Sequence, residues 1–117
     1  MEKKDDLELK NLEQFIGTTQ YYNVLNANVT DGIKYIMDNG YSWFVTDALI
    51  VIKMKLKTEP FLTVKLLLNE TKKDTATMEI SDGNDNVFYT QIYSFTDAKR
   101  DLTLFYTDNV LMLSNEY

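Results

Sequence analysis

The residues best suited to chemistry lie in one short polar segment, residues 82–86, which reads DGNDN. Oxygen-bearing side chains at alternate positions are how a calcium-binding loop begins. The rest of that pattern fails, because Val87 stands where such a loop needs glycine and Tyr93 where it needs its closing carboxylate. The same residues are typical of a tight turn between two strands, since Asn, Asp and Gly tolerate positive φ. We therefore predict a hairpin turn and no metal site.

The sequence also lacks the residues on which most enzyme chemistry depends. Among its 117 residues there is no histidine and no cysteine. Zinc enzymes, cysteine proteases, Ser-His-Asp hydrolases and disulfide scaffolds are excluded, because each needs one of these side chains. We predict a protein that is not an enzyme and that carries no cofactor. A carboxylate-based, metal-dependent enzyme using Asp82, Asp85 and Asp108 is the least favoured of the alternatives.

Length and composition predict one compact domain over residues 1–117. Hydrophobic residues make up 44% of the chain and charged residues 26%, which fits a soluble domain with a core. The longest purely apolar run, Ala48–Ile52, is far too short to span a membrane, and the charged start of the chain does not resemble a signal peptide. We expect a cytoplasmic protein without membrane contact.

Helical spacing of apolar residues is confined to the first half of the chain. It predicts a short helix over residues 7–16, and a second helix that is capped by Thr30 or Asp31 and ends at Gly40. Residues 18–28 have no clear period and are assigned to a connector. Residues 41–57 fit either a helix or an alternating strand, and we favour a helix from about Ser42 into the low fifties.

After Pro60 the pattern changes to the period of two that is typical of strands. It predicts five strands, which are Leu62–Leu68, Ala76–Ile80, Asn86–Tyr93, Leu102–Tyr106 and Val110–Leu113. Short connections favour an antiparallel meander. The predicted fold class is therefore α+β, with about three N-terminal helices packed on a five-stranded antiparallel meander sheet.

Acidic residues are concentrated in the last part of the chain. Residues 74–117 carry 8 acidic and 2 basic side chains, within a formal net charge of -6. In a meander, the turn at residues 82–86 and the turn at residues 107–109 lie at the same end of the sheet. Asp82, Asp85 and Asp108 would then form an acidic end without lysine or arginine. Such a cluster can imitate the phosphates of a nucleic acid, although a net charge of this size also serves solubility alone.

A second candidate surface is the face of the sheet that the helices leave uncovered. If Phe88 and Ile92 point toward the helices, then Tyr89, Tyr93 and Phe105 point away from them. Exposed aromatic side chains of this kind can form a surface for a partner or for self-association. Cross-strand stabilisation of a half-exposed sheet explains them equally well.

Three segments also carry a family resemblance. They are QFIGTTQYY (residues 14–22), TDGIKYI (residues 30–36) and LFYTDNVLMLSNEY (residues 104–117). The chain resembles, over nearly its whole length, an uncharacterised family of short bacterial and phage proteins with a domain of unknown function. The resemblance implies a setting among phages and mobile elements, but no reaction.

The resulting hypothesis is a non-enzymatic protein-binding module of phage or mobile-element type, which acts on a host nuclease or defence protein as an acidic inhibitor. Its expected partner is another protein, with a homodimer also conceivable. Direct nucleic-acid binding is not expected, because Arg100 is the single arginine and the net charge is negative. The alternative is a module that binds a small molecule or nucleotide signal through the tyrosine-rich helical region.

Overall fold

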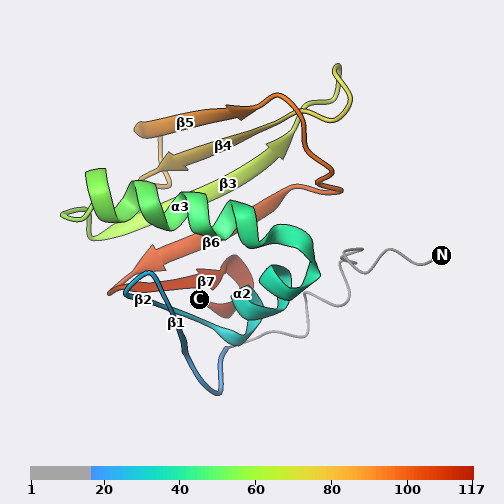
Figure 1. The fold of residues 1–117 in the computed structure, drawn as a ribbon. Helices are drawn as coiled ribbons and strands as arrows, with labels where there is room; N and C mark the ends of the chain where they lie inside the picture. Colours follow the sequence, from blue (N-terminus) through green and yellow to red (C-terminus); the bar gives the residue numbers. More distant parts are fainter. Residues whose placement is uncertain (1–16) are drawn as a thin grey trace.

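The structure is a computed structural model that describes residues 17–117. Within this range a seven-stranded sheet carries one helical layer, which covers a single face of the sheet (Figure 1). The helix predicted over residues 7–16 lies outside the described residues.

The helical layer is one continuous stretch with a kink. Its parts are α2 (Asp31–Ile36), the π-helical turn η1 (Met37–Tyr41) and α3 (Ser42–Lys55). Thr30 caps the first turn as predicted, because its hydroxyl accepts a hydrogen bond from the amide of Ile33. The stretch bends at Asn39 and Gly40, where Gly40 adopts a φ of 101° that other residues rarely reach. The predicted second and third helices are therefore joined without a connecting loop.

The strands follow the predicted positions in the second half of the chain and add a hairpin in the first half. They are β1 (Tyr22–Val24), β2 (Ala27–Val29), β3 (Phe61–Leu68), β4 (Ala76–Ser81), β5 (Val87–Tyr93), β6 (Leu102–Thr107) and β7 (Val110–Leu113). Their order across the sheet is β1-β2-β7-β6-β3-β4-β5. Neighbours pair antiparallel, except that β2 runs parallel to β7. A short 3-10 helix, η2 (Ser114–Glu116), follows β7.

The predicted arrangement of three helices on a five-stranded antiparallel meander is wrong. β6 does not continue the meander beside β5 but pairs with β3, so that Thr63 lies between Ser81 on one side and Phe105 on the other. The connection over residues 94–101 is long enough to carry the chain back across the ends of β4 and β3. Among the strands that the structure describes, β5 is therefore an edge strand with β4 as its single neighbour.

The segment assigned to a connector forms the β1–β2 hairpin. Its turn places Leu25 and Asn26 at φ values of 51° and 65°, the conformation of a two-residue hairpin turn. Leucine is rare at positive φ. With Leu25-Asn26 in the turn, the sequence lacks the Asn-Gly or Asp-Gly pair that usually marks this kind of hairpin. β2 then pairs with β7 through Val29 and Leu111.

The core lies between the helical layer and one face of the sheet. α3 contributes Phe44, Leu49 and Ile52, and the sheet contributes Leu62, Val64, Leu66, Met78, Ile80, Leu104 and Leu111, all fully buried. The opposite face is not covered by the described helices. Instead, Phe61, Phe105 and Tyr117 pack against one another there, with ring centroids 5.2 to 5.5 Å apart.

Two contacts hold the first turn of α2. The carboxylate of Glu116 accepts hydrogen bonds from the Thr30 hydroxyl (2.6 Å) and from the amide of Gly32 (3.1 Å). The carboxylate of Asp31 accepts two bonds of 2.9 Å from the amide and hydroxyl of Thr19, which lowers the pKa of Asp31. Both contacts place an acid at the positive end of the helix dipole.

Candidate functional site

The feature of this fold that is open to a partner is the edge strand β5. It pairs with β4 on one side, from Ala76 opposite Tyr93 to Ser81 opposite Val87, and no described element lies beyond its other side (Figure 1). Its sequence, VFYTQIY, contains no charged residue, proline or glycine. Natural sheets usually protect a long edge with such residues or with a covering element. Apart from the register shift at its start, β5 therefore presents a row of backbone donors and acceptors that nothing within residues 17–117 covers.

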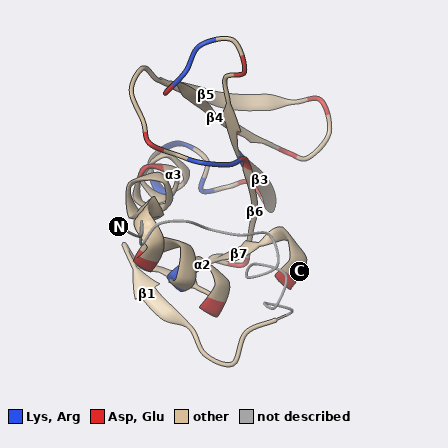
Figure 2. Cartoon of the chain, turned by 90° about the vertical axis from the view of Figure 1, so that its right-hand side faces the viewer, with Lys and Arg blue, Asp and Glu red and all other residues tan. Residues whose placement is uncertain are grey.

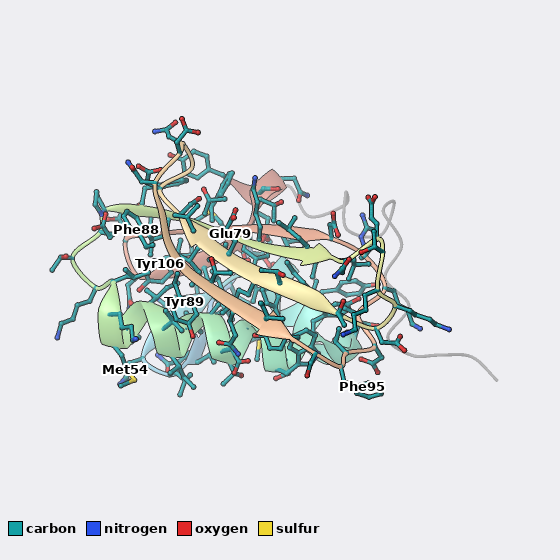
Figure 3. All side chains as sticks on the ribbon, turned by 90° about the horizontal axis from the view of Figure 1, so that it is seen from above. Met54, Glu79, Phe88, Tyr89, Phe95 and Tyr106 are labelled. Carbon is teal, nitrogen blue, oxygen red and sulfur yellow. The ribbon has the colours of Figure 1, made fainter. Side chains whose placement is uncertain are left out.

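The side chains of β5 divide between the two faces of the sheet. Phe88, Thr90 and Ile92 lie on the face away from the helices, where 38% of Phe88 and 74% of Ile92 is exposed. Val87, at the start of the strand, is 48% exposed. We call the open backbone edge of β5 together with Val87, Phe88, Thr90 and Ile92 the β5 edge surface. Figure 3 shows Phe88 pointing away from α3, on the side opposite to Tyr89.

On the helical face, β5 is fixed to α3 by its tyrosines. The hydroxyl of Tyr93 donates a hydrogen bond of 2.8 Å to Asp47, and its ring meets the Trp43 ring edge-on at 4.9 Å. Burial, followed by the bond to Asp47, raises the pKa of Tyr93 well above its usual range. The Lys55 ammonium lies 5.7 Å from the centre of the Tyr89 ring. These contacts hold β5 in place although no element of the described part of the chain pairs with its outer side.

A cavity opens where β5 ends. It has a volume of about 480 Å³ and is lined by Trp43, Tyr93, Phe95, Thr96 and Asp97. The Phe95 side chain is 82% exposed at its rim. Small-molecule sites are commonly lined by aromatic side chains with a few polar groups, as this cavity is. The cavity is open to solvent.

The three residues predicted for the outer sheet surface do not share one face. Tyr89 and Tyr93 point toward α3, whereas Phe105 lies on the opposite face within the cluster of Phe61 and Tyr117. The prediction that Phe88 and Ile92 point toward the helices is therefore wrong, because both side chains lie on the opposite face. Tyrosine can occupy the helical face at the margin of the core, because its ring packs while its hydroxyl reaches a polar partner.

The predicted acidic turn is a hairpin turn held by its own hydrogen bonds. The carboxylate of Asp82 accepts bonds from the amide of Asn84 (2.8 Å) and from the side-chain amide of Asn86 (2.8 Å). These bonds, with the Asn86 side chain contributing most, lower the pKa of Asp82. Gly83 adopts a φ of 90° in this turn. Asp82 therefore shapes the connection into β5, and Asp85 is exposed beside it.

Asp108 lies at the same end of the sheet, as predicted, but in different surroundings. β4 and β6 both end next to the start of β3, with the turns that hold Asp82 and Asp108 on either side of it. The Lys53 ammonium donates to the Asn109 side chain (2.5 Å), and Lys53 and Lys57 line the same cavity as Asp108. The expectation that this end lacks lysine is therefore wrong, because the end of α3 reaches it.

Two further observations bear on the chemistry that the described residues allow. Within residues 17–117 no group of three or more acidic side chains is close enough together to hold a metal ion. No helix in this part of the chain is both long and apolar enough to cross a membrane.

Comparison with known proteins identifies the family but no function. No curated protein and no solved structure matches the chain. Residues 6–117 match the Family of unknown function (DUF6876). Because this match covers nearly the whole sequence, the chain belongs to that family.

Proposed function

We propose that the protein is a non-enzymatic binding module that recognises another polypeptide through the β5 edge surface. The observation that carries this proposal is an uncharged edge strand of seven residues that no described element covers. Strand addition to such an edge uses backbone hydrogen bonds for affinity and the flanking side chains for specificity. Here Phe88 and Ile92 are the exposed apolar side chains that a partner would cover.

The acidic end supports this proposal less well than β5 does. A nucleic-acid mimic needs carboxylates that a basic groove can reach without competition from neighbouring cations. Lys53 and Lys57 accompany Asp108, and the Asp82 carboxylate already accepts the hydrogen bonds of its own turn. An inhibitor of a host nuclease or defence protein fits this module better if it uses β5 for contact and the acidic turns for long-range attraction.

The test is affinity capture from the cells that naturally make the protein, with two matched variants as baits. Ile92→Lys places a charge in the β5 edge surface, and Met54→Lys places the same charge at an equally exposed position on α3 (exposed fractions 74% and 73%). We expect the wild type and Met54→Lys to capture the same partner in equal amounts. Ile92→Lys should recover at least tenfold less of this partner. Equal recovery by all three baits would contradict the proposal.

The second candidate function is binding of a small molecule or nucleotide signal, and the cavity beside Trp43 favours it. Its volume of about 480 Å³ is within the range of small-molecule sites. Because Trp43 is the single tryptophan of the chain, a ligand that enters the cavity should change the intrinsic fluorescence. A nucleotide and metabolite panel that changes neither this fluorescence nor the melting temperature would eliminate the candidate.

A further inference from the structure

We propose that the partner of the β5 edge surface is β5 of a second copy, paired antiparallel about a two-fold axis close to Thr90. This inference rests on the proposed function, because it assigns an occupant to the same surface. It joins the two sheets into one continuous sheet, with both helical layers on the same face. Such closed two-fold dimers are the commonest form of homo-oligomer.

The first support is that β5 is complementary to itself in this register. Thr90 is the middle residue of Val87–Tyr93, so antiparallel pairing about Thr90 places Phe88 opposite Ile92 of the other copy. Each of these exposed apolar side chains then covers the other on the outer face. On the helical face the pairing sets Tyr89 opposite Gln91 of the other copy. Within a single strand the Tyr89 hydroxyl already donates a hydrogen bond of 2.9 Å to the Gln91 side chain, so the two side chains are compatible partners.

The second support is the distribution of charge around the edge. The turn before β5 carries Asp82 and Asp85 (Figure 2). The other end of the sheet has mixed charge: residues 70–74 carry two lysines and two acids, and residues 97–101 after β5 carry two bases and two acids. Antiparallel pairing brings the acidic turn of each copy to this end of mixed charge in the other copy and keeps the two acidic turns apart. Parallel pairing would instead bring two acidic turns together.

The third support is that self-pairing meets no charge within the strand. A charged side chain on an edge strand discourages the addition of another strand, and a charge at the axis would also face its own copy. β5 has neither. The register between β4 and β5 shifts between Ile80 and Ser81, where Phe88 is the additional residue of β5, so the stretch from Tyr89 to Tyr93 keeps a regular ladder.

The absence of cysteine from the sequence allows a direct test of the register. Thr90→Cys gives a protein with one cysteine, and the proposed axis brings the two cysteines opposite each other, within the Cα separation that a disulfide spans. On mild oxidation we expect a disulfide-linked dimer that forms at least tenfold faster than with Met54→Cys. A double variant, Phe88→Cys with Ile92→Cys, should also crosslink, because the same register pairs these positions. Equal rates for all variants would overturn the proposal.

The mass in solution is the second measurement. Light scattering of the wild type at rising concentration should approach twice 13.7 kDa, and Met54→Lys should do the same. Ile92→Lys and Thr90→Pro should remain monomeric while keeping the far-ultraviolet circular dichroism of the wild type. Ile92→Lys is the informative variant if Thr90→Pro fails to fold. A monomeric wild type, or a dimer unaffected by Ile92→Lys, would refute self-pairing.

These outcomes separate the inference from the proposed function. If the wild type is monomeric but a different protein is captured in an Ile92-dependent way, self-pairing is wrong and the binding function of β5 stands. If neither self-association nor capture depends on Ile92, both are wrong.

Discussion

The contact between Tyr93 and Asp47 gives the sharpest prediction about what holds β5 in place. Tyr93→Phe removes only the hydroxyl that donates to Asp47 at 2.8 Å and leaves the ring against Trp43. A hydrogen bond to a charged acceptor contributes about 1.5–3 kcal/mol, and because Tyr93 is half-buried we expect a loss at the lower end, about 1.5 kcal/mol. For a domain of this size that corresponds to a melting temperature lower by about 6 °C.

Urea unfolding followed by Trp43 fluorescence measures this loss, since the indole is 4.9 Å from the Tyr93 ring. Tyr89→Phe is the matched control, because within the described residues its hydroxyl donates to Gln91 of the same strand and not to α3. A double-mutant cycle of Tyr93→Phe with Asp47→Ala should give a coupling energy of about 1 kcal/mol. If the two losses simply add, or if Tyr89→Phe costs as much, the bond does not anchor β5.

The raised pKa of Tyr93 also predicts the effect of pH on this contact. A group whose pKa is raised by folding stabilises the protein fully below its unfolded value, about 10 for tyrosine, and this stabilisation is lost as pH rises toward the folded pKa. We therefore expect the stability difference between the wild type and Tyr93→Phe to shrink above about pH 10. A difference that is constant from pH 7 to pH 11 would show that the hydroxyl does not titrate in this way.

Three further predictions concern the helical layer. Gly32→Ala should destabilise the protein by about 1–3 kcal/mol in thermal unfolding, although alanine favours helices, because the new Cβ would lie 2.5 Å from Leu113 and 2.7 Å from Glu116; a gain in stability would contradict this packing. Glu116→Ala should cost about 1–2 kcal/mol, as it removes the acceptor for Thr30 and Gly32, and a loss of only a few tenths would refute this capping role. Because the pKa of Asp31 is lowered, its carboxylate stabilises the folded protein above about pH 4, and this stabilisation is lost as pH falls through the folded pKa. The difference in unfolding free energy between the wild type and Asp31→Asn, measured with urea, should therefore vanish in acid. A difference that persists there would argue against the bonds to Thr19.

The sequence predicted most of the local structure because the local signals agree with the fold. Thr30 was identified as a cap, the helix from Ser42 into the fifties was expected, and all strands after Pro60 were located to within about two residues. In these segments the hydrophobic period, the caps and the turn residues indicate the same element.

The order of the strands was not predictable in the same way. Whether β6 pairs with β5 or with β3 depends on the path of residues 94–101, and both pairings bury the same alternating side chains. The β1–β2 hairpin was missed because Leu25 occupies a turn position that sequence patterns assign to glycine or asparagine.

The error at the candidate site follows from the faces of β5. By hydrophobicity alone, Phe88 and Ile92 are the better core residues, and Tyr89, Gln91 and Tyr93 the better surface residues. The observed orientation is the reverse because Asp47 and Lys55 of α3 provide polar partners for the tyrosines. The signal that pointed to β5 was its lack of charge in a chain that is 26% charged.

Hydrogen–deuterium exchange of the β5 amides at two protein concentrations tests the central claim most directly. In a monomer the outward-facing amides between Val87 and Tyr93 have no partner among the described strands and should exchange rapidly, whereas in the β5 dimer they are hydrogen-bonded. We predict protection of these amides that rises with concentration and is lost in Ile92→Lys but not in Met54→Lys. Exchange of β5 that is fast and the same at every concentration would contradict the account.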